Sequence, residues 1–309
     1  ILNYYKNSKF FLEFWKLRQI IKKEKPDILH CFLPHANIIG RFAAIGSSCK
    51  VICSIRAKQC EKKYFLPFDR FTQKLVNIYT VNSKSLAQFE IVQKIDKNKI
   101  VLIENGIDFE IFKITNNPNN LRNELNLQNL IIISMVAHLR KQKDYPTALR
   151  AIKHLQKEFN ICFLIIGTGN PFENEIYKIY NLIDELELSN VKLLGFRNDI
   201  PNLLAITDVW ISSTLYEGQS NSLLEAMAMG IPIVTTDISE NAEVVRDGKE
   251  ALLVPIKSPL LMSKAIKRLI TNKKLAKTIS KNAYDRVYAK YHINKTLEKL
   301  EHLYSSLLT

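Results

Sequence analysis

The chain has 309 residues and a mass of 35.7 kDa, enough for about two ordinary domains. Its 47% apolar and 24% charged residues exclude disorder and collagen-like repeats for most of the chain. No run of about 18 apolar residues occurs, so no membrane-spanning helix is predicted. The net charge of +14 is uneven, with +10 in residues 1–125 and +4 in the remainder. This favours an anionic partner, namely an acidic membrane surface, nucleic acid or a phosphorylated substrate.

The first part of the chain alternates between strand and helix patterns. Helices are predicted over residues 9–25, 35–45, 68–77 and 84–93, and strands over residues 27–32, 51–55, 78–82 and 100–103. Strands that alternate with helices favour a parallel sheet with right-handed crossovers. A segment rich in Asn, Gly and Pro, over residues 104–120, is the best linker candidate.

A second α/β series follows this linker. Strands are predicted over residues 130–136, 161–166, 191–194, 209–212, 233–235 and 251–254. The tail from residue 259 to 308 is mostly helical, with a break near His292. We therefore expect three parts: residues 1–112 and 113–291 as two doubly wound domains, and residues 292–309 as a helix that packs back on the first.

The segment 208–248 carries the clearest site pattern. A strand ends near Ser213, Gly218 lies in the loop, and Ser220 supplies a capping oxygen for a helix that runs to about Met229. Glu217 then lies on the loop and Glu225 in the early helix, beyond the carboxyl end of the strand, where doubly wound sheets bind ligands. The free amides of residues 221–224 are expected to form an anion site. Carboxylates beside an anion site suit an anion that carries hydroxyls, such as a nucleotide sugar.

Glu217 and Glu225 have seven residues between them and are followed by Ala-Met-Ala-x-Gly-x-Pro, which resembles the E-x7-E signature of retaining glycosyltransferase family 4. Further segments resemble this family in the same order: residues 26–30, 105–112, 136–143, 194–196 and 240–248. The resemblance covers the chain from about residue 9 to its end. It implies the GT-B fold, in which two Rossmann-like domains face each other across a cleft.

The resemblance also implies roles for single residues. Glu217 would bind donor-sugar hydroxyls and stabilise the oxocarbenium-like transition state, Lys143 would neutralise the leaving diphosphate, and Glu225 would hold the ribose hydroxyls. The donor-binding candidates are His138, Arg140, Phe196, Gly218, Ser222, Leu223, Leu224, Glu225 and Glu243. The acceptor-side candidates are His35, Arg56 and Asn105, and His30 lies at the same strand end as His35.

The sequence departs from the family pattern at several positions. His138 stands where the family has an arginine, and Arg140 is the candidate that would supply the missing charge. Arg56 replaces a family histidine, and residues 239–241 lack the two glycines of a loop beside the sugar. The family's first βαβ region does not precede the helix at residues 9–25, so the first domain is expected to be incomplete.

We interpret the chain as a retaining, metal-independent glycosyltransferase that uses a UDP- or GDP-linked sugar and a saccharide or lipid-linked acceptor in surface polysaccharide or glycolipid synthesis. No cofactor or metal is expected, because Asp-x-Asp is missing and the histidines lack metal-ligand spacing. Five cysteines without a Cys-x-x-Cys pair, Cys60 among them, fit reduced thiols in the cytosol. The expected location is cytoplasmic, peripheral on the inner face of the membrane.

Three alternatives remain open. The first is an inactive GT-B remnant that only binds nucleotide or a partner, and the second is a GT-B sugar-nucleotide epimerase. The third is a nucleic-acid-binding protein, which only the positive charge favours. No RNP motif or zinc finger occurs in the sequence, so no nucleic-acid partner is expected.

Overall fold

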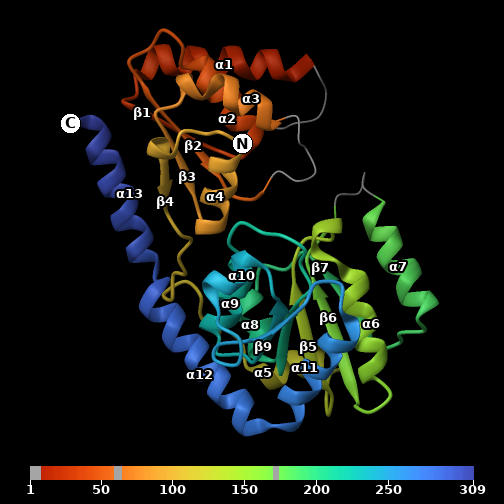
Figure 1. The fold of residues 1–309 in the computed structure, drawn as a ribbon. Coiled ribbons are helices and arrows are strands. Elements are labelled where there is room, and N and C mark those ends of the chain that lie inside the picture. The colour runs from red at the N-terminus through yellow and green to blue at the C-terminus, as the bar shows by residue number, and fades with distance from the viewer. Residues whose placement is uncertain (1–7, 59–64, 170–173) are drawn as a thin grey trace. The chain divides into compact units, whose positions relative to one another are not determined.

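The computed structural model describes residues 8–58, 65–169 and 174–309, and it divides the chain into two compact units (Figure 1). Unit 1 comprises Ile1–Glu104 with Thr296–Thr309, and unit 2 comprises Asn105–Lys295. These boundaries differ from the expected 112/113 and 291/292. The segment after Glu104 belongs to unit 2 because Ile107 forms a parallel bridge with His292, in which the Ile107 amide donates to the Tyr291 carbonyl at 2.8 Å.

Unit 1 contains a four-stranded parallel sheet with the order β1-β2-β3-β4. Its strands are β1 (Ile28–Phe32), β2 (Lys50–Ile55), β3 (Ile78–Val81) and β4 (Ile100–Leu102). Its helices are α1 (Ser8–Glu24), α2 (Pro34–Ala43), α3 (Phe65–Thr72), α4 (Lys84–Val92) and the greater part of α13 (Ile293–Leu308). The strand–helix alternation predicted for this part is confirmed.

Helix α13 closes one face of this sheet although it is the last element of the chain. Leu303 of α13 is buried against Ile52 and Ile103. His30 of β1 joins helix and sheet, since its Nδ1 lies 2.8 Å from the Tyr304 hydroxyl and its Nε2 lies 2.8 Å from Ser54 Oγ. Burial, assisted by the charge of Arg56, lowers the pKa of His30 to about 4, so the ring is neutral at pH 7. One ring nitrogen of His30 therefore contacts α13, and the other contacts β2.

Unit 2 contains a six-stranded parallel sheet with the order β10-β9-β8-β5-β6-β7. Its strands are β5 (Ile131–Val136), β6 (Ile161–Ile166), β7 (Val191–Gly195), β8 (Val209–Ser212), β9 (Ile233–Thr236) and β10 (Leu252–Val254). Its helices are α5 (Pro118–Glu124), α6 (Tyr145–Leu155), α7 (Glu175–Glu185), α8 (Ile200–Ala205), α9 (Asn221–Ala228), α10 (Ser239–Val244), α11 (Pro259–Thr271) and α12 (Lys273–Lys290). The six predicted strands are confirmed, but the helical tail also breaks at Asn272, whose side chain caps α12 at the Leu275 amide.

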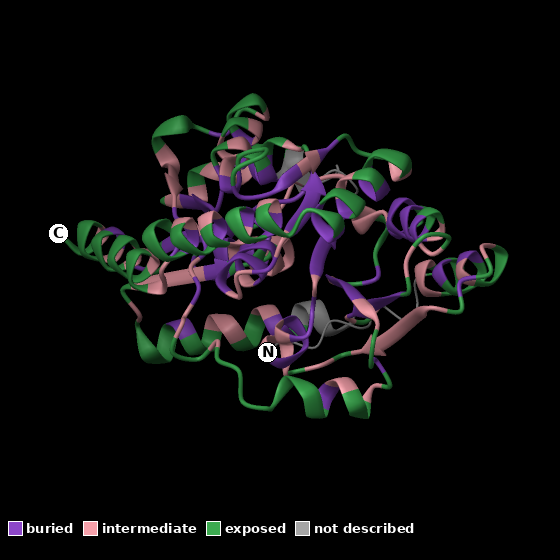
Figure 2. Ribbon diagram, turned by 90° about the horizontal axis from the view of Figure 1, so that it is seen from below, coloured by how far each residue is buried: buried purple, intermediate pink, exposed green. Residues whose placement is uncertain are grey.

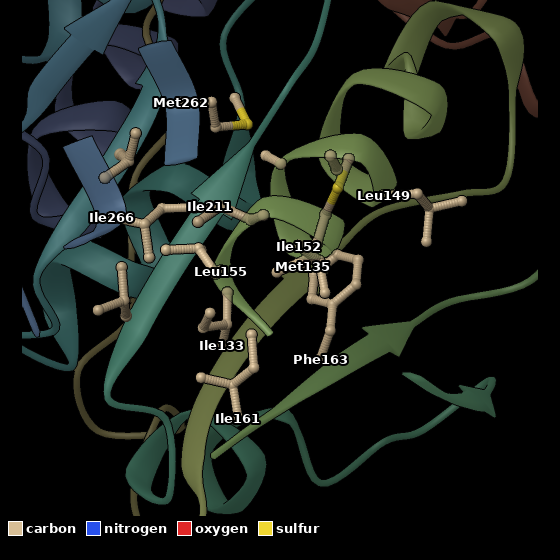
Figure 3. Packing of buried hydrophobic residues seen from close by; sticks show 14 of the residues in the cluster. Ile133, Met135, Leu149, Ile152, Leu155, Ile161, Phe163, Ile211, Met262 and Ile266 are labelled. Atoms are coloured by element: carbon tan, nitrogen blue, oxygen red, sulfur yellow. The ribbon is translucent and has the colours of Figure 1, made fainter. Parts of the chain in front are cut away.

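Helices cover both faces of the unit 2 sheet. On one face, side chains of α6 and α11, such as Ile152 and Ile266, pack against β5, β6 and β8 (Figure 3). On the other face, α9 and α12 bury Trp210 of β8, and successive residues of β5, Ile132 and Ile133, belong to different core clusters. In both units the buried residues gather on the strands and on the helix faces next to them (Figure 2). Strands buried on both faces explain the continuous apolar runs in the sequence.

The order of the unit 2 strands places a ligand-binding position beside β5. The chain runs outward from β5 to β6 and β7, and then returns to the other side of β5 to form β8. The carboxyl ends of β5 and β8 therefore border the topological switch point, where open parallel sheets bind their ligands.

Unit 1 buries a carboxyl group that makes its stability depend on pH. Glu90 of α4 is 1% exposed, and its Oε1 has no hydrogen-bond partner among the described residues. Burial, assisted by the charge of Asp69, raises the pKa of Glu90 to about 8. Because this value lies above the ordinary one, the neutral carboxyl stabilises the fold below pH 4.5, and this contribution is lost as the pH rises through 8.

We expect Glu90→Gln to gain stability over the unsubstituted protein by about 1.4 kcal/mol for each pH unit between about 4.5 and 8. Hydrogen exchange of the β2 and β3 amides at pH 6 and pH 8 measures this difference within unit 1. Glu24→Gln, on the exposed end of α1, is the matched control and should change little at either pH. An equal effect of Glu90→Gln at both pH values would contradict the prediction.

Candidate active site

Two loops lie at the switch point of unit 2. The loop after β5 forms a turn of 3-10 helix, Lys141–Lys143, which ends at Asp144 in the left-handed conformation, with φ 47°. The loop after β8 runs from Ser213 to Gly218 and is buried along most of its length. The Leu215 amide donates to the Gln142 carbonyl at 2.9 Å, and Ser213 Oγ lies 2.8 Å from the Lys143 carbonyl. These contacts hold segments about 70 residues apart in the sequence in one fixed arrangement.

Glu217 is the centre of this arrangement. It is only 7% exposed, and its Oε1 pairs with the Lys143 ammonium and accepts a hydrogen bond of 3.0 Å from Thr214 Oγ1. Its Oε2 accepts from the Gln142 amide at 3.2 Å. The sequence places Glu217 and Lys143 in one site, and the structure brings them into direct contact. A buried carboxylate next to a lysine can stabilise positive charge on a sugar while the lysine faces a phosphate.

Glu225 lies on the first turns of α9. Its side chain is half-buried, and within the described ranges 8–58, 65–169 and 174–309 it forms no side-chain hydrogen bond or ion pair. Burial raises the pKa of Glu225 above the ordinary glutamate value. An unpaired carboxylate in this position can accept hydrogen bonds from the hydroxyl groups of a ligand.

The start of α9 differs from the expected anion site. The Leu223 amide donates to the Ser220 hydroxyl at 3.3 Å, and the Leu224 amide donates to the Ser220 carbonyl at 3.3 Å. Two of the four amides predicted to be free are thus occupied by the cap. The Leu223 and Leu224 side chains are fully buried in the core, and Ser222 Oγ lies 3.2 Å from Ser220 Oγ. The expectation of four free amides was wrong because the capping serine uses part of them.

The ends of β5 and β7 carry three further donor-side candidates. His138 and Arg140 are exposed after β5, and His138 Nδ1 lies 3.2 Å from the Thr168 carbonyl. Phe196 follows β7 and is 77% exposed. Gly167 allows the strand ends to approach, because a Cβ atom there would lie 2.1 Å from the Ala137 carbonyl oxygen and its φ is +142°.

Glu243 lies in α10, half-buried after β9. Its carbonyl accepts from the Arg286 guanidinium at 3.2 Å. The preceding segment, which lacks the glycines of the family pattern, is held by Asn241, whose amide donates to the Thr236 carbonyl at 3.0 Å. A side-chain hydrogen bond thus stabilises the turn at this position.

The three acceptor-side candidates belong to different units. His35 is on the first turn of α2 and Arg56 follows β2, both in unit 1. Asn105 belongs to unit 2, where its side-chain amide donates to Asn221 Oδ1 at 2.6 Å and to the Gln219 carbonyl at 3.2 Å. Asn105 thus contacts the loop between Glu217 and Glu225, and its acceptor-side role stays a prediction.

Sequence reasoning missed Gln142 and Thr214, which bind the Glu217 carboxylate directly. Each has a weak signal in the sequence: Gln142 precedes the lysine of the motif, and Thr214 follows the predicted strand end.

Across residues 8–58, 65–169 and 174–309, no three His, Cys, Asp or Glu side chains are grouped to hold a metal ion. In the same part of the chain, no helix is long and apolar enough to cross a membrane. The four cysteines described are free and buried, and Cys60 lies outside the described residues.

Comparisons with known proteins agree with this architecture. The sequence model described as "Glycosyl transferases group 1" matches residues 117–286, and the one described as "Glycosyltransferase Family 4" matches residues 1–111. The UDP-Gal:alpha-D-GlcNAc-diphosphoundecaprenol alpha-1,3-galactosyltransferase of Escherichia coli is 29% identical, over 98% of this chain and 80% of that protein. The capsular polysaccharide biosynthesis glycosyltransferase CapM of Staphylococcus aureus is 27% identical, over 95% of this chain and 80% of that protein.

Solved structures give the same fold. Anabaena Alr3699/HepE in complex with UDP and glucose superimposes with a TM-score of 0.89 at 19% identity, covering 95% of this chain and 81% of that one. A glycosyltransferase from Rickettsia africae superimposes with a TM-score of 0.83 at 22% identity, covering 99% and 83%. The two parallel-sheet units have the GT-B fold, and the chain belongs to the glycosyl transferases group 1 family.

Proposed function

We propose that this glycosyltransferase is retaining and metal-independent, and that it transfers a sugar from a UDP-linked donor to a saccharide or lipid-linked acceptor in cell-surface polysaccharide synthesis. The observation that carries the proposal is the buried Lys143–Glu217 pair at the switch point, with Glu225 unpaired on the following helix. UDP is proposed because the similar HepE structures are complexes with UDP, and because the Escherichia coli relative is named for a UDP-linked donor.

In this proposal the charged side chains of the site lie where charge develops on the sugar and on the leaving diphosphate. Glu217 accepts hydrogen bonds from the sugar hydroxyls and stabilises the oxocarbenium-like charge as the bond from the anomeric carbon to the diphosphate breaks. Lys143 carries three donor hydrogens, so it can keep its contact with Glu217 and also bind a phosphate oxygen. Glu225 accepts hydrogen bonds from the ribose hydroxyls. It helps to bind the donor and takes no part in the step that breaks the bond.

The acceptor and the location are proposed from the relatives. The Escherichia coli relative is named for a diphosphoundecaprenol acceptor, and CapM is named for capsular polysaccharide biosynthesis. We propose a peripheral position on the inner face of the membrane, supported by the +10 charge of residues 1–125. Flotation with vesicles that contain anionic lipid tests this at low and high salt, and an unbound protein at low salt would refute it.

Titration with UDP, GDP and ADP by calorimetry tests the donor site. We expect UDP to bind most tightly and Glu225→Gln to weaken its affinity about 10- to 100-fold, because a charged acceptor for hydroxyl groups is lost. Because burial raises the pKa of Glu225, UDP affinity should begin to fall at a higher pH than with an ordinary glutamate as the solution is acidified.

Glu187→Gln, at an exposed position of unit 2, is the matched control and should bind UDP as the unsubstituted protein does. Equal UDP affinity in Glu225→Gln would remove Glu225 from the site. Binding of none of the three nucleotides would favour the inactive remnant. Transfer from an α-linked donor in the presence of EDTA tests the mechanism. We expect transfer to continue in EDTA, as metal independence requires, and NMR to assign an α-linked product, as retention requires.

A further inference from the structure

Gln142 contacts the Glu217 carboxylate from the loop after β5. Its Nε2 lies 2.6 Å from the Tyr216 carbonyl oxygen and 3.2 Å from Glu217 Oε2. Both of these partners are acceptors only, so the amide must turn its NH2 group toward them, whichever way its nitrogen and oxygen are assigned. The two hydrogens of that group are both used.

The three donors to Glu217 divide between its two oxygens. Lys143 and Thr214 contact Oε1, and Gln142 contacts Oε2. Without the Gln142 amide, Oε2 would have no protein donor in the described part of the chain, and the carboxylate could rotate about its last bond. Gln142 thus supplies the contact that sets the plane of this group.

The side chain of Gln142 can be replaced without removing the hydrogen bonds that its backbone makes to the other loop. Other contacts between the two loops do not use this side chain: the Gln142 carbonyl accepts from the Leu215 amide, and the Ser213 hydroxyl donates to the carbonyls of Lys143 and Asp144. A substitution at Gln142 removes the side-chain contacts with Glu217 and with the Tyr216 carbonyl, and leaves these bonds in place. The role of the amide can therefore be tested without dismantling the loop.

We infer that Gln142 is a positioning residue, which fixes the orientation of the Glu217 carboxylate toward the donor sugar. The inference rests on the proposed function in that it assigns Glu217 to the sugar. It extends that proposal to a residue outside the E-x7-E segment, on the opposite side of the switch point.

Gln142→Glu tests the inference without any sugar donor, and Gln142→Met tests it in the transfer reaction. Glutamate keeps the shape but replaces the NH2 donor by a second carboxylate next to Glu217, and like charges at this distance cannot both ionise freely. The charged group already in contact with Glu217 among the described residues is Lys143, which stays in both variants. Titration by 13C NMR of glutamate Cδ, with the Glu217 signal assigned from Glu217→Gln, follows the carboxylate directly.

We expect the midpoint of the Glu217 titration in Gln142→Glu to lie at least one pH unit above that of the unsubstituted protein. Gln128→Glu is the matched control, since the exposed Gln128 side chain donates to the exposed Asn123 side chain at 3.0 Å, and it should leave the midpoint in place. Gln142→Met should lower kcat of transfer at least tenfold while UDP affinity stays within about twofold, because Glu225 is untouched.

The possible outcomes separate the two proposals. An unchanged Glu217 midpoint in Gln142→Glu, or an unchanged kcat in Gln142→Met, overturns the positioning role. A shifted midpoint in a protein that transfers no sugar supports the contact between Gln142 and Glu217 and refutes the proposed reaction. Equal losses of kcat and UDP affinity in Gln142→Met would show a collapsed loop and would also overturn the inference.

Discussion

Replacing Lys143 with alanine is expected to lower the rate of sugar transfer by about two to three orders of magnitude, the range found when one preorganised donor to a developing charge is removed. Two effects combine. The leaving diphosphate loses a cation, and Glu217, which is 7% exposed and pairs with Lys143, keeps a buried negative charge without its counter-ion. Both effects act at the reacting centre, so kcat should fall far more than the affinity for UDP.

The measurement is kcat with saturating UDP-sugar, together with UDP affinity from calorimetry. Lys141→Ala is the matched control, because Lys141 lies on the same turn of 3-10 helix and is exposed. Its activity should remain within about twofold. Lys143→Arg keeps the charge and should recover only part of the rate, since a planar guanidinium does not fit the space of an ammonium. A Lys143→Ala enzyme with at least a third of the native kcat would contradict the assigned role.

Most of the fold could be predicted from the sequence because its signals are local. The apolar run at residues 130–136 became β5 (Ile131–Val136), and Pro26 marks the end of α1 at Glu24, both close to the expected bounds. The unit boundaries depend on long-range pairing. Ile107 stays with unit 2 because it pairs with His292, far along the chain, and no local pattern reports such a contact.

The candidate site could be predicted where a motif fixes a residue and its neighbours in sequence. The motifs select Glu217, Glu225 and Lys143 as candidates in this way. Their contacts could not be found, because the Lys143–Glu217 pair joins two loops through the tertiary structure. The amide of Leu223 was expected to be free, yet it binds the cap at Ser220. Gln142 looks like any polar loop residue until the strand order brings it next to Glu217.

The buried charges of unit 1 escaped prediction for a related reason. Arg41 lies on a short helix of small residues, and in sequence its charge looks like that of a solvated face. In the structure its side chain is 0% exposed and its guanidinium lies 2.6 Å from Asp69 Oδ1. It also donates to the Asn37 carbonyl at 2.9 Å and to Thr72 Oγ1 at 2.7 Å. Arg41 thus uses its several N–H donors inside the protein, a requirement for a buried cation.

We expect Arg41→Met to destabilise unit 1 by about 3–5 kcal/mol, because it removes a buried guanidinium that lies 2.6 Å from the buried Asp69 carboxylate. Methionine fills much of the same volume, so the loss reflects charge more than packing. Unfolding of unit 1 is followed by hydrogen exchange of the β2 amides in denaturant, since a two-domain protein need not unfold in one step.

The double variant Arg41→Met with Asp69→Asn decides whether the pair itself is responsible. It removes both charges, so it should be more stable than Arg41→Met alone, and the two single effects should not add. Arg70→Met, beside Asp69 in the sequence but exposed, is the control for losing an arginine and should change stability by less than about 0.5 kcal/mol. If Arg41→Met and Arg70→Met had equal effects, the buried ion pair would be a consequence of the fold and would do little to stabilise it.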